Sequence, residues 1–131
     1  MPHFTVEYSA NLEMSIDMTD LCDVVREAAL ETGIFPVGGL RVRAVRCEHY
    51  SIADDDPDNA FIDIAGKVGV GREEKVRKAA AIMMFQKIEA HLEAHFGERP
   101  LALSFEIREL DANTNMKRNS IHEKLKEKGV V

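Results

Sequence analysis

The sequence has 131 residues, of which 45% are hydrophobic, and a formal net charge of −6. This length and composition predict a single domain over residues 1–131 with a core of its own. The acidic balance argues against a nucleic-acid binder, which needs a basic face, but it leaves room for a local cationic pocket. No stretch approaches the ~20 apolar residues of a membrane span. The first residues also lack the features of a secretion signal, so we expect a cytoplasmic protein with no membrane contact.

Two cysteines, Cys22 and Cys47, are too few for a disulfide framework in a chain of this length. Both lie in segments whose apolar residues are periodic. We therefore expect them to be small buried hydrophobic side chains without a redox role.

The first half of the chain has the pattern of a strand, a helix and a second strand. Apolar and polar residues alternate from His3 to Tyr8, which predicts a strand that begins at about the second residue. From Thr19 apolar residues recur at helical spacing, and Gly33 is a natural end for that helix. Residues 40–47 then predict a second strand with an arginine-rich start.

The same order of elements recurs in the second half. Residues 61–65 predict a third strand, which the glycines at positions 66, 69 and 71 would end. A long helix is predicted from about Arg72 to Phe96, followed by Gly97 as a stop. Residues 101–107 alternate as a fourth strand. We expect the buried side of the long helix to consist of Val76, Ala80, Met83, Ile88 and Leu92.

The end of the chain predicts a short third helix. Ser120 and Glu123 have the spacing of a capping box, in which each side chain accepts from the backbone N–H group of the other residue. Gly129 follows as a stop.

The two halves are pseudo-repeats, at about residues 2–50 and 60–110, and an extension over residues 111–131 follows them. Crossover helices imply parallel pairing of the strands within each β-α-β unit. The sequence therefore predicts an α+β fold, in which the duplicated units form a four-stranded sheet with two helices on one face. The other face of such a sheet needs cover, and the obvious cover is another copy of the chain.

Motifs for common cofactors are incomplete. The glycine-rich segment at 69–71 lacks the third glycine of a dinucleotide fingerprint, because Glu74 stands at that position. An acidic run resembles the start of a calcium loop, but Asn59 stands where the loop requires glycine. His91 and His95 lie one helical turn apart without an evident third metal ligand. We therefore expect neither a cofactor nor a metal.

Pro2 stands at the start of a strand with one buried face. The initiator methionine is usually removed when a small residue such as proline follows, and its removal would leave a free secondary amine. An α-amino group has a pKa of ~7.7–8.0, which partial burial and nearby arginines would lower toward the range of a general base. A retained methionine would instead make this nitrogen an amide, which is not a base.

Three arginines are candidates for binding an anion. Arg41 and Arg43 are two positions apart on a predicted strand and therefore share one face of it. Arg72 stands at the predicted start of the long helix, where the helix dipole disfavours a cation and an anionic ligand would explain its presence. A guanidinium binds a carboxylate best through two parallel hydrogen bonds. Arginines on a strand also face solvent or pair with acids, so both interpretations remain open.

Five segments, in the same order, resemble the 5-carboxymethyl-2-hydroxymuconate Δ-isomerase family of the tautomerase superfamily. None is specific alone, but together they are, and they extend along nearly the whole chain. The segments are Pro2-His3-Phe4, Thr32-Gly33-Ile34-Phe35-Pro36, Gly39-Leu40-Arg41-Val42-Arg43, Gly69-Val70-Gly71-Arg72 and Leu101-Ala102-Leu103-Ser104-Phe105-Glu106-Ile107.

The resemblance implies a homotrimer of tautomerase-like subunits and a catalytic N-terminal proline, here Pro2. It also implies that Arg41 and Arg72 bind and polarise a small carboxylate substrate, with Arg43 as a further candidate. The reaction would convert a dienol acid, 5-carboxymethyl-2-hydroxymuconate, to its conjugated 2-oxo isomer without a cofactor. The implied context is aromatic compound catabolism, in homoprotocatechuate (4-hydroxyphenylacetate) degradation.

The residues alone leave two other functions open. A related tautomerase could act on another enol acid, such as 2-hydroxymuconate or phenylpyruvate. A trimeric binding protein could use the same fold without catalysis, because a fold does not determine a function. In any of these cases only the first half can supply a free amine, since the second half begins inside the chain near Ala60.

Overall fold

The computed structural model describes residues 1–130, so Val131, at the end of the expected extension, lies outside the described residues. Short 3-10 helices, η1 (Ala10–Leu12) and η2 (Val37–Gly39), precede α1 and β2. The strands and longer helices follow one another in the order β1 (His3–Ser9), α1 (Met18–Glu31), β2 (Arg41–Cys47), β3 (Ala60–Val68), α2 (Glu74–Phe96), β4 (Leu101–Glu109) and α3 (Ile121–Glu127).

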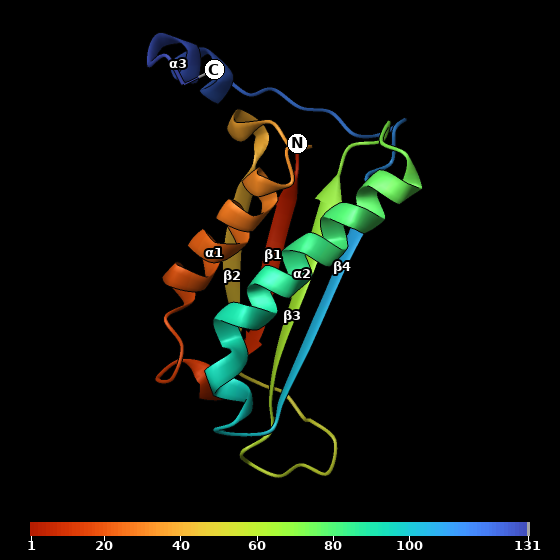
Figure 1. Cartoon of the computed structure of the whole chain (residues 1–131). Helices are drawn as coiled ribbons and strands as arrows, with labels where there is room; N and C mark the ends of the chain where they lie inside the picture. Colours follow the sequence, from red (N-terminus) through yellow and green to blue (C-terminus); the bar gives the residue numbers. More distant parts are fainter. Residues whose placement is uncertain (131) are drawn as a thin grey trace.

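The four strands form one mixed sheet in the order β2-β1-β3-β4. β1 pairs in parallel with β2, and β3 pairs in parallel with β4, as two β-α-β units require. The units join through antiparallel pairing of β1 with β3 at the centre of the sheet. Figure 1 shows this arrangement, with β1 and β3 running in opposite directions. The predicted four-stranded sheet of two β-α-β units is therefore confirmed.

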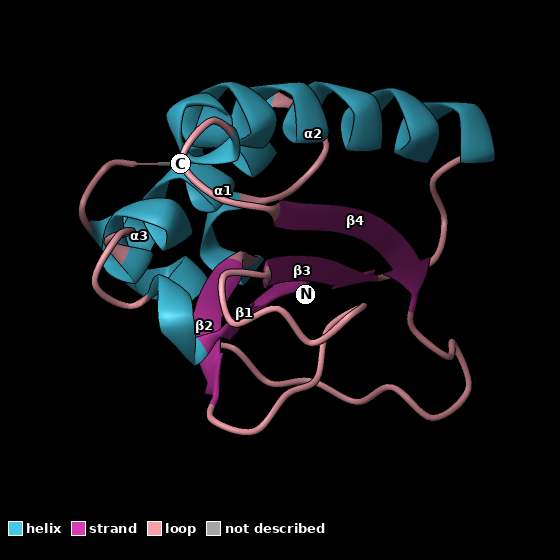
Figure 2. Cartoon of the chain, turned by 90° about the horizontal axis from the view of Figure 1, so that it is seen from below, coloured by secondary structure: helices cyan, strands magenta, loops and turns pink. Residues whose placement is uncertain are grey.

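α1 and α2 cover one face of the sheet (Figure 2). The side chains that alternate toward these helices in β1 are buried, whereas Glu7 on the opposite face is exposed. β3 contributes the buried Ile62 and Ile64 to the same core. The alternation in the sequence therefore correctly identified the core face of both central strands. No helix within residues 1–130 is long and apolar enough to cross a membrane.

The buried side of α2 differs from the prediction at one position. Ala80, Met84, Ile88 and Leu92 are buried, whereas Met83 is 43% exposed. The buried residues recur every four positions, and this row faces the sheet. Met83 lies about 100° around the helix from Met84, so it points away from that row.

Two expected boundaries also differ. Gly66 does not end β3, which continues to Val68; it lies within the strand, where a Cβ would collide with the ring of Phe4. α2 begins at Glu74 instead of Arg72. The reason is the backbone just before it: Gly71 has φ +118° and Glu73 is extended, so neither belongs to a helix.

Two side-chain expectations are corrected as well. Cys22 and Cys47 are free thiols that are only partly buried. The predicted capping box is absent, because the side chain of Ser120 makes no capping hydrogen bond. Asn119 replaces it: its Oδ1 accepts a hydrogen bond of 2.9 Å from the N–H group of Ile121.

The directions of the strands bring four segments to one edge of the sheet. Here this edge is the line of strand ends at which β1 and β2 begin. The starts of β1 and β2 meet there, with His3 opposite Arg41. Because β3 is antiparallel to β1, its end reaches the same edge, with Lys67 opposite His3. The end of β4 follows, with Arg108 opposite Lys67. The segment after β4 then crosses this edge to reach α3, above the N-terminus (Figure 1).

Phe4 anchors the beginning of the chain in the core. It is fully buried and lies opposite Gly66 in the β1–β3 ladder. Its ring is stacked on Phe105 at 6.2 Å and meets Phe35 edge-on at 5.9 Å. A Cβ at position 66 would lie 2.4 Å from Cε1 of Phe4, so only glycine fits beneath the ring.

Replacement of Gly66 by alanine should therefore destabilise the fold by about 1–3 kcal/mol, the usual cost of overpacking a core. The free energy of unfolding can be measured by urea denaturation. Gly97→Ala is the matched control, because a Cβ there makes an ordinary contact of 3.6 Å and φ is −82°. An unchanged urea midpoint for Gly66→Ala would show that the Phe4 ring is not held at this place.

Candidate active site at the N-terminus

Pro2 is buried at the start of β1 and is held by two contacts. Its carbonyl oxygen accepts a hydrogen bond of 3.2 Å from the backbone N–H of Arg41, which extends the β1–β2 ladder by one residue. A Cβ at Gly39 would lie 3.4 Å from Cδ of Pro2, so the backbone of this glycine lies close to the proline ring. The residue predicted as the base therefore has a fixed position, shielded from water.

The terminal amine of the structure belongs to Met1, which directly precedes Pro2. Burial lowers the pKa of this amine, and the charge of Lys117 lowers it further. The charges of Arg41 and Arg72 act in the same direction. All of these effects disfavour the ammonium form. The environment at this end of β1 therefore favours a neutral amine, the form that accepts a proton.

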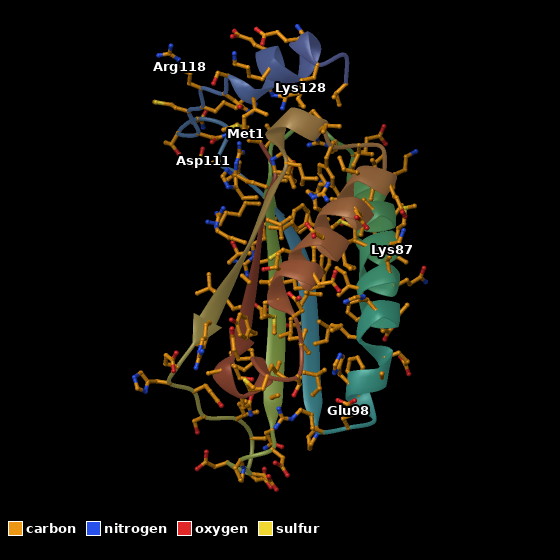
Figure 3. The ribbon with its side chains drawn as sticks, turned by 90° about the vertical axis from the view of Figure 1, so that its left-hand side faces the viewer. Met1, Lys87, Glu98, Asp111, Arg118 and Lys128 are labelled. Atoms are coloured by element: carbon orange, nitrogen blue, oxygen red, sulfur yellow. The ribbon has the colours of Figure 1, made fainter. Side chains whose placement is uncertain are left out.

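Arg41 directs its guanidinium group toward the chain terminus. Nη1 donates a hydrogen bond of 2.9 Å to the carbonyl oxygen of Gly39 and contacts Sδ of Met1 at 3.3 Å. A thioether sulfur is a weak acceptor, and a carboxylate oxygen is a much stronger partner for a guanidinium. Met1 therefore lies where an anionic ligand of Arg41 would bind. In Figure 3, Met1 lies at the end of the sheet beneath α3.

Arg72 packs inward from the loop before α2. Its guanidinium carbon is 5.0 Å from the centre of the Phe35 ring. Nε and Nη2 donate to the carbonyl oxygen of Ile34 at 3.1 and 2.9 Å, and Nη1 donates to that of Gly69 at 3.2 Å. These contacts use three of the five N–H groups of an arginine, including the edge formed by Nε and Nη2. Arg72 can offer a carboxylate only the remaining N–H groups of Nη1 and Nη2.

Arg43 does not join this group. It is exposed, and its Nη1 and Nη2 atoms lie 3.4 and 3.3 Å from Nδ1 of His3. The pKa of His3 is lowered by burial and then by the charges of Arg41, Arg43, the N-terminus and Lys67. Arg43 therefore acts on the residue next to Pro2 and has no contact with Met1 or Pro2 among those described.

A cavity of about 260 Å³ adjoins the N-terminus. Half of its lining comes from the beginning of the chain and η2, and half comes from the tail. The lining residues are Met1, Pro36, Gly39, Lys117, Asn119 and His122. The three tail residues had no predicted role, because nothing in the local sequence pattern indicates that the tail returns to the N-terminus.

One hollow of the described chain is poorly suited to bind an anion, and the predicted absence of a metal concerns other residues. A hollow of about 420 Å³ lies between residues 13 and 19, but its charged lining residues are Glu13 and Asp17. Within residues 1–130 no group of three or more His, Cys, Asp or Glu side chains could hold a metal ion. His95 lies 3.2 Å from Glu98 instead. The N-terminal end of the sheet therefore combines a cavity, a shielded nitrogen and cationic side chains.

Comparisons with known proteins identify the family of the chain. The profile of the family described as 5-carboxymethyl-2-hydroxymuconate isomerase matches residues 2–125. The chain belongs to this family. It is 39% identical over 122 residues to the 5-carboxymethyl-2-hydroxymuconate Delta-isomerase of Escherichia coli, which covers 93% of this chain and 97% of that protein. The family is one of isomerases, so this protein is an enzyme of that class.

Two solved structures share the fold of this chain. The crystal structure of a 5-carboxymethyl-2-hydroxymuconate isomerase from Deinococcus radiodurans R1 superimposes with a TM-score of 0.87 at 37% identity, over 94% of this chain and 92% of that chain. A fused 4-OT protein, described as a symmetric trimer, superimposes with a TM-score of 0.59 at 17% identity, over 88% and 90%. The second similarity shows the tautomerase-type fold alone.

The electrostatic coupling at this site can be tested through His3. Replacement of Arg43 by glutamine removes one of the charges that repel the protonated imidazole, so the pKa of His3 should rise toward its ordinary value. NMR titration of the His3 ring signals measures this shift. Arg118→Gln is the control, because Arg118 is exposed in the tail and is not among the charges that act on His3. A fall in the pKa of His3 in Arg43→Gln would contradict the assigned coupling.

Proposed function

We propose that this isomerase converts 5-carboxymethyl-2-hydroxymuconate to its conjugated 2-oxo isomer by proton transfer through the amine of Pro2, in homoprotocatechuate degradation. The observation that carries the proposal is the shielded position of Pro2 beside Arg41, in an environment that lowers the pKa of an amine. The names of the family and of the relatives supply the substrate. Neither a metal nor an organic cofactor enters the proposed reaction.

The proton moves through one nitrogen in two steps. The neutral amine of Pro2 takes the proton from the 2-hydroxyl group of the dienol, so that an O–H bond breaks and an N–H bond forms. The oxygen becomes a carbonyl, the double bonds shift along the chain, and the nucleophilic carbon at the far end of the dienol takes the proton back. Atoms and charges balance without a further reactant, because the amine is regenerated.

Arg41 and Arg72 would bind carboxylates of the substrate and draw electron density toward the 2-oxo acid end. Arg41 can replace its weak contact with Met1 Sδ by a charge-assisted hydrogen bond. Arg72 is pre-oriented by Phe35 and by two backbone carbonyl groups, so it loses little freedom on binding. Such preorganised donors typically lower a barrier by about 2–4 kcal/mol each.

Removal of Met1 is a condition of this mechanism. The nitrogen of Pro2 is an amide while Met1 precedes it, and the side chain of Met1 lines the cavity beside Lys117. Removal of the methionine would both free the secondary amine and empty this space. One change in the chain thus creates the base and opens its access to the substrate.

The assembly that we propose is a homotrimer. The face of the sheet opposite α1 and α2 carries no helix within residues 1–130, and β2 and β4 are edge strands. A sheet exposed on one face is covered in many proteins by another copy of itself. The fused 4-OT relative of the same fold is described as a symmetric trimer, which supports this number of subunits.

The base assignment predicts that Pro2→Ala loses much of the isomerase activity with an unchanged fold, because the secondary amine is lost. Turnover of the dienol is followed by ultraviolet absorbance, and the fold by circular dichroism. Pro57→Ala, in an exposed loop, is the matched control and should keep full activity. Intact-mass spectrometry of both proteins establishes whether Met1 has been removed.

Two outcomes would contradict the assignment. Turnover by Pro2→Ala equal to that of the parent protein would remove Pro2 as the base. Full activity of a preparation in which every chain retains Met1 would do the same, because an amide nitrogen cannot accept the proton.

The trimer predicts a solution mass of three times the 14.7 kDa chain in light scattering. Val45→Glu should reduce this mass, because Val45 is 44% exposed on the uncovered face of the edge strand β2. Ile82→Glu is the control, since Ile82 is 49% exposed on α2, on the other side of the sheet. A mass that falls in Ile82→Glu but not in Val45→Glu would place the interface on the helices and reject the proposed arrangement.

A further inference from the structure

The tail reaches the candidate active site from the far end of the chain. After β4 it crosses the edge of the sheet at which β1 begins, and α3 lies above the N-terminus (Figure 1 and Figure 3). Lys117 lies on this crossing segment and lines the cavity next to Met1. Among charged side chains, Lys117 lowers the pKa of the terminal amine most, ahead of Arg41 and Arg72.

Asn119 and His122 hold the tail against η2. Nδ2 of Asn119 donates a hydrogen bond of 2.7 Å to the carbonyl oxygen of Gly38, while Oδ1 caps the first turn of α3. The ring of His122 lies directly on Gly38, where a Cβ would come within 2.5 Å of Nδ1. α3 has no buried residue of its own, so these contacts are what hold it against η2. They place Lys117, two residues before Asn119, at the mouth of the cavity.

Within residues 1–130 the cations that act on the terminal amine form no ion pair with an acidic side chain. Elsewhere basic residues form ion pairs, for example Arg77 with Glu109 at 3.5 Å and Arg46 with Glu48 at 2.7 Å. Among the described residues no carboxylate lies within ion-pair distance of Arg41, Arg72 or Lys117. Like charges that act on one amine also repel one another, and an anionic ligand would relieve that repulsion.

We propose that Lys117 is a specificity-determining residue, whose ammonium group binds the one substrate carboxylate that Arg41 and Arg72 leave unpaired. This inference rests on the proposed function. The substrate named by the family has three carboxylates, two on the muconate chain and one on the carboxymethyl group. Arg41 and Arg72 account for two of them. Lys117 lines the cavity from the segment between β4 and α3 and supplies a third cation, so it would distinguish a tricarboxylate from a dicarboxylate.

The test compares Lys117→Ala with the parent protein on two dienols, 5-carboxymethyl-2-hydroxymuconate and the dicarboxylate 2-hydroxymuconate. The KM for the tricarboxylate should rise by about tenfold to a hundredfold, the range expected for a charge-assisted hydrogen bond. At a pH above the acid limb of the profile, where the amine is neutral in both proteins, the KM for the dicarboxylate and both kcat values should change less than about twofold. Lys117→Arg should restore the lower KM, because it keeps the charge.

Two further variants separate charge from structure. Lys124→Ala removes an exposed lysine of α3 that pairs with Glu127, outside the cavity, and should leave both KM values unchanged. Gly38→Ala displaces His122 and loosens the tail, so it should reproduce the selective rise in KM for the tricarboxylate while Lys117 itself is intact.

The pH dependence gives a readout that a purely structural role would not change. Arg41 on β2, Arg72 before α2 and Lys117 act on the amine, His122 on α3 shares its cavity, and Lys67 on β3 acts on the neighbouring His3. Removal of the charge of Lys117 should move the acid limb of kcat/KM to higher pH, because the amine is then protonated more easily. Lys117→Arg should return the limb to its original position.

The proposal is overturned if Lys117→Ala leaves the KM for the tricarboxylate unchanged, or if it raises both KM values equally. Binding of the 2-oxo tricarboxylate product, measured by calorimetry, tests Lys117 separately from the reaction. If the parent protein binds this product but turns over neither dienol, the proposed function fails. Lys117 is then still supported by a Kd that weakens at least about tenfold in Lys117→Ala, and it is rejected by an unchanged Kd.

Discussion

The directions of the strands are the constraint on which the candidate site depends. Because β1 is parallel to β2 and antiparallel to β3, the chain begins at the edge where β2 starts and β3 ends. This places Pro2 beside Arg41 and near the loop that carries Arg72. β4 ends at the same edge and sends the tail with Lys117 across it. Pairing of the strands therefore brings segments that are far apart in the sequence toward one nitrogen, and contacts of Arg72 and of the tail complete the arrangement.

The charge around that nitrogen opposes the charge of the whole chain. The net charge is −6, yet Lys117, Arg41 and Arg72 all lower the pKa of the terminal amine. A bound polycarboxylate would neutralise these cations and so remove part of the repulsion that disfavours the ammonium form. The amine would then be a stronger base in the presence of substrate than in the free protein. The same cations would thus keep the base unprotonated beforehand and allow it to accept a proton when the substrate is bound.

Local periodicity predicted much of the fold, because alternation and helical spacing determine which side chains can share a face. It failed where packing between distant segments decides the outcome, as for Met83 and Met84 on α2. At the site, the resemblance to a family pointed to Pro2 and two arginines. It could not reveal that Arg72 donates hydrogen bonds to the carbonyl oxygens of Ile34 and Gly69. Nor could it assign a role to Lys117, since that role depends on contacts of the tail with η2.

The duplicated topology produces one such site and not two. In the first unit the N–H of Arg41 donates to the carbonyl of Pro2, and in the second the N–H of Ala60 donates to the carbonyl of Pro100. β3 is antiparallel to β1, so the second unit begins at the opposite ends of the strands. The nitrogen of Ala60 is an amide inside the chain, and a hollow beside it is lined by no basic side chain. Each chain can therefore supply one N-terminal amine, and an assembly of such chains would have as many sites as it has N-termini.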